Sequence, residues 1–98
     1  MSRGPVWGAA SEDLNATKLV WPAGEQVVEH VADRDVTYVV LAGSATLTVD
    51  GVAHALSAGD VLIVEKGTRR ALVAGRGGVE YVTVHRRREA LQIRPLPG

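Results

Sequence analysis

No cysteine and no phenylalanine occur among the 98 residues, and aromatic residues make up only 4% of the chain. The absence of cysteine excludes disulfide bonds, thiolate catalysis and cysteine-bound zinc. Because 46% of the residues are nevertheless hydrophobic, the core must be built mostly from valine, leucine, isoleucine and alanine. Valine is stiff at χ1 and suits a pleated sheet better than a helix, so this composition favours β structure.

An excess of charge of either sign is also missing, since 11 basic residues balance 11 acidic ones. Nucleic-acid-binding domains usually carry a basic excess, so nucleic acid is not an expected partner. No apolar stretch approaches the length of a membrane span, and no basic start precedes an apolar run as in a secretory signal. We therefore expect a cytoplasmic protein that does not bind membranes. A chain this short predicts one domain over residues 1–98, with a core limited enough to favour a homodimer.

Turn residues divide the chain into short apolar segments that are typical of β-strands. Residues 1–16 lack a clean periodicity and are predicted to form an irregular N-terminal arm, while residues 87–98 are predicted to form a polar tail. The core of the domain is expected over about residues 17–86, with breaks at Gly43 and over the loop Gly75–Gly78. The predicted strands are 17–21, 25–32, 36–41, 44–49, 52–56, 61–64, 69–73 and 79–85.

Asp50-Gly51 is the strongest hairpin signal in the chain. It follows an alternating segment in which Ala45, Leu47 and Val49 share one face. Frequent turn signals between short strands, together with the lack of a convincing helix, predict an all-β sandwich or barrel.

Two segments carry a resemblance to a known family. The first contains Pro22-Ala23-Gly24, His30 and Val39–Gly43, and the second contains Gly59–Val64, Gly67 and Arg70. With these spacings the chain resembles the cupins, and it is identified as a small single-domain cupin of the cupin 2 type. The resemblance covers residues 22–73. It implies a double-stranded β-helix, or jelly-roll, barrel that opens at one end to a pocket.

The resemblance assigns metal ligands to positions 30, 32, 36 and 70, and here the sequence departs from the family pattern. Only His30 is of the expected type, because Ala32, Val36 and Arg70 occupy the other positions. Alanine and valine have no lone pair to donate, arginine is a permanent cation, and a catalytic metal normally needs about three protein ligands. We therefore expect a degenerate metal site with no metal and no cofactor. Substitute ligands, which the spacing does not support, would have to come from Glu25, Glu29, His54 or His85.

The candidate site residues have structural as well as functional interpretations. His30 is either an inert relic of the metal site or a general base or ligand contact. Arg70 should point into the barrel, where it either forms a salt bridge with a residue such as Glu80 or binds a carboxylate or phosphate of a ligand. A slip of one residue would give this position to Arg69 instead.

Two further residues are candidate ligand contacts. Tyr38 shares strand parity with Val36 and should therefore face the pocket. His85 shares one face of the last predicted strand with Tyr81 and Thr83, so it either lines the pocket or is solvated at the strand end.

These observations leave several functions open. We favour metal-free binding of a small apolar or anionic molecule. The alternatives are a metal-independent isomerase, epimerase or dehydratase with His30 as base, and a metal-dependent cupin enzyme with rearranged ligands. A purely structural dimer, in which the N-terminal arm covers or exchanges with an edge strand, is also possible.

Overall fold

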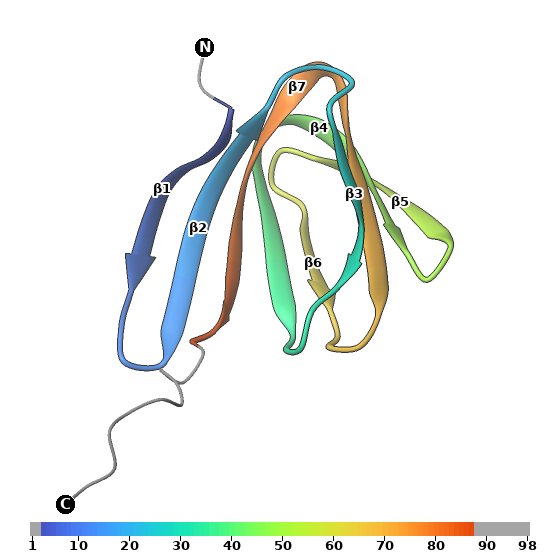
Figure 1. The fold of residues 1–98 in the computed structure, drawn as a ribbon. Helices are drawn as coiled ribbons and strands as arrows, with labels where there is room; N and C mark the ends of the chain where they lie inside the picture. Colours follow the sequence, from blue (N-terminus) through green and yellow to red (C-terminus); the bar gives the residue numbers. More distant parts are fainter. Residues whose placement is uncertain (1–2, 88–98) are drawn as a thin grey trace, which may run out of the picture.

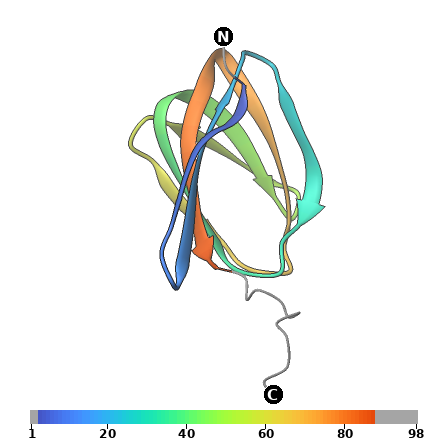
Figure 2. The same cartoon turned by 60° about the vertical axis from the view of Figure 1, so that its left-hand side comes forward.

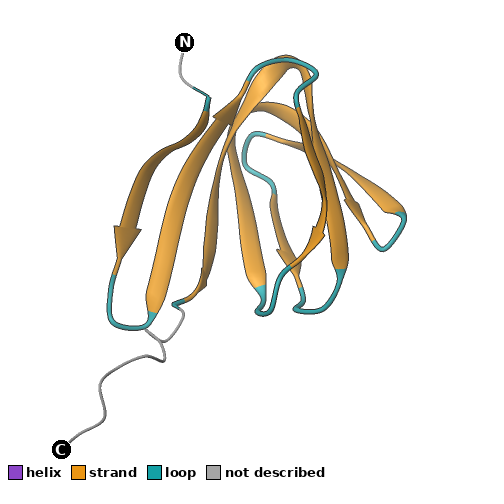
Figure 3. Cartoon of the chain, viewed as in Figure 1, coloured by secondary structure: helices purple, strands orange, loops and turns teal. Residues whose placement is uncertain are grey.

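The structure is a computed structural model that describes residues 3–87. These residues form seven β-strands and no helix (Figure 1; Figure 3). No segment of the described chain is therefore a helix long and apolar enough to cross a membrane. The all-β prediction is confirmed, whereas the predicted polar tail lies outside the described residues from position 88 onward. The strands are β1 (Gly4–Ala10), β2 (Leu14–Trp21), β3 (Gln26–Val31), β4 (Val36–Val49), β5 (Val52–Ser57), β6 (Val61–Val64) and β7 (Arg69–Arg86).

Two long strands, β4 and β7, connect the whole barrel. The main path of the sheet is β1-β2-β7-β4-β5, with β3 added to β7 and β6 added to β4, and all pairs are antiparallel. The first part of β7 pairs with β3 and the second part pairs with β2, while β4 runs beside β7 through both parts. In Figure 2, β3 and the β1–β2 hairpin accordingly lie on opposite sides of the barrel. The interior is therefore enclosed by strands that are far apart in the sequence.

Glycines allow β4 and β7 to bend together, and here the predicted breaks are wrong. The chain was expected to leave its strands at Gly43 and at Gly75–Gly78, yet both stretches lie inside continuous strands. The β4–β7 register shifts on either side of Gly43, and Gly43 and Gly78 both have positive φ. A Cβ at Gly43 would collide with the carbonyl oxygen of Gly78. Glycine at this point permits a close backbone approach rather than ending the strand.

The prediction of an irregular N-terminal arm does not hold for Gly4–Ala10, which form strand β1. This strand pairs with β2, and β2 starts at Leu14 rather than at the expected Thr17. Gly4, Pro5 and Gly8 obscure the strand pattern in the sequence. Proline is tolerated here because β1 is an edge strand, where one side of the backbone needs no ladder partner.

The predicted hairpin at Asp50-Gly51 is confirmed. Both residues have positive φ, 48° and 83°, as a type I′ turn requires, and Val49 pairs with Val52 across it. The alternation before the turn also holds, since Ala45 and Leu47 are buried while Thr46 is exposed. Buried side chains from several strands form one core: Val36, Tyr38, Val40, Ala45, Leu47, Leu56, Val64, Leu72, Ala74, Val79 and Tyr81.

Candidate functional site

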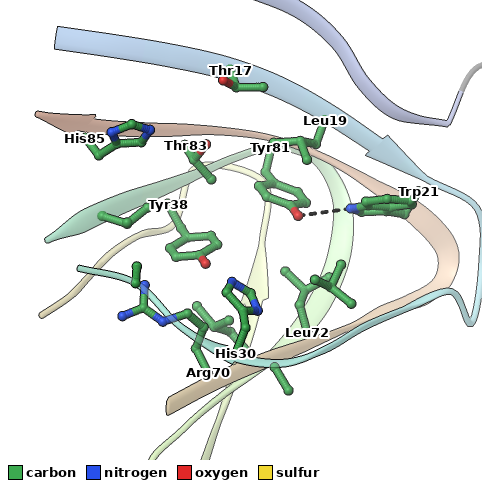
Figure 4. Close-up of a pocket in the computed structure, with 15 residues that line it drawn as sticks. Thr17, Leu19, Trp21, His30, Tyr38, Arg70, Leu72, Tyr81, Thr83 and His85 are labelled. Carbon is green, nitrogen blue, oxygen red and sulfur yellow. Dashed lines mark hydrogen bonds between the residues drawn. The ribbon is translucent and has the colours of Figure 1, made fainter. Parts of the chain in front are cut away.

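A cavity of about 250 Å³ lies inside the barrel (Figure 4). Its walls are mainly aliphatic and aromatic with a few polar groups, a combination typical of small-molecule pockets. Among the described residues that line it there is no aspartate and no glutamate. The lining residues are Thr17, Leu19, Trp21, Val27, His30, Ala32, Val36, Tyr38, Leu47, Arg70, Ala71, Leu72, Tyr81, Thr83 and His85.

The structure brings His30, Tyr38, Arg70 and His85 together around this cavity. His30 on β3 lies opposite Arg70 on β7, and it remains exposed at the rim of the cavity. Tyr38 on β4 lies opposite Thr83 of β7, and its hydroxyl points toward the space between Arg70 and His30 (Figure 4). His85 is half-buried in the cavity wall rather than solvated at the strand end.

Arg70 is almost completely buried, with 1% of its surface exposed. Its Nε donates to the carbonyl oxygen of Thr68 at 3.1 Å, and its Nη2 donates to that of Glu65 at 3.0 Å. Its Nη1 is buried and has no hydrogen-bond partner among the described residues. The neighbouring Arg69 is exposed, so the strand register turns Arg70 and not Arg69 to the interior.

The predicted salt bridge from Arg70 to Glu80 is not formed. Glu80 lies on the outer face of β7, where its carboxylate is 2.8 Å from the ammonium of Lys18. The reason is strand parity: Tyr81 is buried inside the barrel, so its neighbour Glu80 must point outward. The guanidinium of Arg70 is thus held by carbonyl dipoles, and no carboxylate among residues 3–87 pairs with it.

Two stacked tyrosines form the wall beside Arg70. The rings of Tyr38 and Tyr81 have centroids 5.8 Å apart at an interplanar angle of 30°. Burial raises the pKa of Tyr38, while the hydrogen-bonding contact of its hydroxyl with the Arg70 guanidinium and the charge of Arg70 act in the opposite direction. Burial also raises the pKa of Tyr81, to about 12, although its hydroxyl accepts a hydrogen bond from Trp21 Nε1 at 3.0 Å. Both phenols are therefore neutral hydrogen-bond donors at physiological pH.

The two histidines of the cavity both direct Nδ1 at a backbone carbonyl oxygen. His30 Nδ1 lies 2.9 Å from the carbonyl oxygen of Val28, and His85 Nδ1 lies 2.9 Å from that of Arg86. A carbonyl oxygen can only accept, so each Nδ1 must carry the proton and donate it. In the neutral ring, Nε2 is then left with a lone pair that can accept a proton or a hydrogen bond.

The family model for the cupin domain matches residues 18–85. The chain belongs to the cupin domain family. The sequence resemblance to cupins and the expected jelly-roll fold are thereby confirmed. No curated protein matches the sequence.

Solved cupin structures share this fold at low sequence identity. KdgF from Halomonas sp. is 24% identical with a TM-score of 0.77, and the match covers 83% of this chain and 76% of that one. A cupin superfamily protein from Desulfitobacterium hafniense is 27% identical with a TM-score of 0.72, covering 80% and 71% of the two chains. A cupin protein from Bacteroides fragilis is 21% identical with a TM-score of 0.75, covering 97% and 88%. At such identities the likeness supports the fold.

The four positions to which the sequence resemblance assigns metal ligands all line the cavity. They are His30, Ala32, Val36 and Arg70, so their donors are one imidazole, two hydrocarbon side chains and one guanidinium. Residues 3–87 also contain no group of three His, Asp or Glu side chains placed to hold a metal ion elsewhere. This set of residues does not fit a divalent metal, because the guanidinium repels it and one imidazole is too few ligands.

Several wall residues were not singled out from the sequence. Leu19 and Trp21 of β2 and Leu72 of β7 form the apolar end of the cavity, opposite Arg70 (Figure 4). The signal was present as alternation, because Leu19 and Trp21 are two residues apart and share a face. Strand parity alone does not say that β2 lies beside the second part of β7, which is what brings these side chains into the barrel.

Proposed function

We propose that this cupin is a metal-free binding protein that holds a small organic molecule inside its barrel. The strongest support is Arg70, a buried cation at a position to which the sequence resemblance assigns a metal ligand. A fixed positive charge disfavours a metal ion and favours a neutral or anionic guest. The aliphatic and aromatic walls of the cavity suit the hydrocarbon part of such a molecule.

Elemental analysis of protein purified without added metal is the first test. We expect no stoichiometric metal. Iron, manganese, nickel or zinc at one atom per chain would overturn the metal-free proposal and favour an enzyme with rearranged ligands.

The second test is titration with a panel of small carboxylates, phosphates and neutral aromatic compounds. Trp21 lines the cavity, so its fluorescence should respond to a bound guest, and a guest that binds the native state should raise the melting temperature. Saturable binding by at least one compound class is expected. If no compound in the panel binds, the cavity is not a ligand site for small molecules of these classes.

The geometry of His30 favours one alternative function, a metal-independent isomerase, epimerase or dehydratase. Donation from His30 Nδ1 to Val28 leaves Nε2 as a base at the rim of the cavity, within the set of residues that line it. Because His30 is exposed, a His30→Ala variant should fold normally. With a substrate in hand, unchanged turnover in this variant would remove His30 from the mechanism.

We also propose that the chain forms a homodimer through the outer face of the sheet that runs from β1 through β2, β7 and β4 to β6. Trp7, Val61 and Ile63 are 55%, 58% and 62% exposed there. Lys18 and Glu80 on the same face neutralise each other in an ion pair within the chain, so they add no net charge that would repel a twofold-related copy. One row of neighbours crosses this face from β1 to β6 through Trp7, Lys18, Val82, Val39 and Val61.

A further inference from the structure

The guanidinium of Arg70 is a buried charge that forms no ion pair with any carboxylate of residues 3–87. Its Nε and Nη2 are used by the carbonyl oxygens of Thr68 and Glu65, while Nη1 has no partner in the described part of the chain. Leaving a buried donor unpaired and a buried charge uncompensated is costly, so such groups in native structures call for an explanation. An anion in the adjacent cavity would compensate the charge.

The groups around Arg70 are arranged to receive such an anion. The Tyr38 hydroxyl points into the space between Arg70 and His30 (Figure 4). As a neutral phenol it can donate one hydrogen bond to an oxygen of the guest. Among the described residues, the cavity lining contains no aspartate or glutamate that would repel a negative charge or compete for Arg70.

The end of the cavity remote from Arg70 determines the chemistry of the rest of the ligand. Leu19, Leu72 and the ring of Tyr81 line it, and the indole of Trp21 lies at the end remote from Arg70 (Figure 4). The indole nitrogen of Trp21 already donates to Tyr81, so its hydrogen-bonding capacity is used within the wall. This end therefore favours hydrocarbon over polar groups. A cavity of about 250 Å³ holds a ring or a branched chain, since a benzene molecule fits an apolar cavity of roughly 150 Å³.

We propose that the ligand of this cupin is a small monocarboxylate with an aromatic or branched aliphatic body. Its carboxylate lies against Tyr38 and the charge of Arg70, and its hydrocarbon part points toward Leu19 and Leu72. One guanidinium balances one negative charge, whereas a phosphate monoester, which carries close to two at neutral pH, would leave a buried excess. The site therefore selects carboxylates over phosphates. This inference rests on the proposed binding function and specifies its ligand.

Calorimetric titration with benzoate, benzamide and phenyl phosphate tests the charge requirement directly in the unmodified protein. The three probes share one ring and differ in the charge of the head group. Benzoate should bind at least about tenfold more tightly than either of the others, as expected for attraction between its carboxylate and the nearby charge of Arg70. Equal affinity for benzoate and benzamide, or tighter binding of phenyl phosphate, would overturn the inference.

Single substitutions test whether the preference for benzoate depends on Arg70. Arg70→Met should weaken benzoate binding by about tenfold or more, Arg70→Lys should retain part of it, and Tyr38→Phe should cause a smaller loss. Arg69→Met is the matched control, because it removes the same charge from the exposed neighbouring position and should leave benzoate binding unchanged. Equal losses in Arg69→Met and Arg70→Met would show a general charge effect and overturn the inference.

The same titrations separate this inference from the binding function on which it rests. Benzamide and other neutral compounds that bind as well as benzoate would leave the binding function intact and remove the carboxylate assignment. Absence of binding by every compound of the broader panel would remove both. If Arg70→Met fails to fold by circular dichroism, the comparison of benzoate with benzamide in the unmodified protein still decides the matter.

Discussion

Replacing Arg70 by methionine distinguishes a guanidinium that supports the fold from one that serves a ligand. The side chain makes two charge-assisted hydrogen bonds to carbonyl oxygens, each stabilising by about 1.5–3 kcal/mol. Against this, a buried charge without a partner costs several kcal/mol in desolvation, roughly the same amount. Methionine has a similar length, and burying its side chain contributes about 1.5–3 kcal/mol. Glu65 is exposed, so water can hydrate its carbonyl once the guanidinium is gone.

We therefore expect Arg70→Met to keep the free energy of unfolding unchanged or to raise it by up to about 2 kcal/mol, as for other buried charges replaced by apolar groups. Urea unfolding followed by circular dichroism measures this, with an unchanged m value showing that the two states still differ by the same surface. Arg69→Met is the control and should stay within about 0.5 kcal/mol of the parent. A loss greater than about 2 kcal/mol in Arg70→Met alone would refute the reasoning, since Arg70 would then hold the barrel together.

Three further predictions concern the barrel itself. Gly43→Ala should lower the free energy of unfolding by more than about 3 kcal/mol, whereas Gly24→Ala, with nearly the same φ but open space, should cost about 1–2 kcal/mol; equal effects in urea unfolding would contradict the close backbone approach. Because burial raises the pKa of Tyr81 from 10.0 to about 12, its contribution of about 2–3 kcal/mol should be complete below pH 10 and lost as the pH rises through 12. Between pH 9 and pH 12 the free energy of unfolding should depend less steeply on pH for Tyr81→Phe than for the parent. Identical slopes would show that ionisation of Tyr81 does not cause the loss of stability. Light scattering after size exclusion should show a dimer, and Trp7→Glu should convert it to a monomer. The control Val52→Glu, at an exposed position on β5, should have no effect. A monomeric parent would refute the dimer proposal.

The interior face could be predicted within the regular stretches of the strands, because side-chain direction there follows residue parity. Parity fails at the register shifts, and on β3 both Val27 and His30 line the cavity although they are three residues apart. Tyr38 was expected in the pocket from its spacing to Val36, and it lines the cavity. The choice between Arg69 and Arg70 followed the same rule once the register was known. The predicted partner of Arg70 was wrong because Glu80 is on the outer side of β7, which its own neighbour Tyr81 already implied.

The glycines show where parity is insufficient. Gly43 and Gly78 are of a residue type that often interrupts strands. The sequence does not tell whether such a glycine ends a strand or lets two strands approach closely. The answer depends on the partner strand, because a collision exists only when another backbone lies within contact distance. The same limit applies to β1, whose strand conformation comes from pairing with β2 rather than from its own residues.

The sequence alone determined the all-β class, the Asp50-Gly51 hairpin and the cupin resemblance, and it showed that Ala32, Val36 and Arg70 occupy positions to which that resemblance assigns metal ligands. These follow from local rules, since turn conformation, strand alternation and the chemistry of a side chain need no distant partner. Only the tertiary structure decided that Arg70 is buried, with an Nη1 that has no partner within residues 3–87, and that Leu19, Trp21 and Leu72 form the far end of the same cavity. Those facts depend on strands separated by tens of residues being held side by side, and contacts of that kind are set by packing rather than by local sequence.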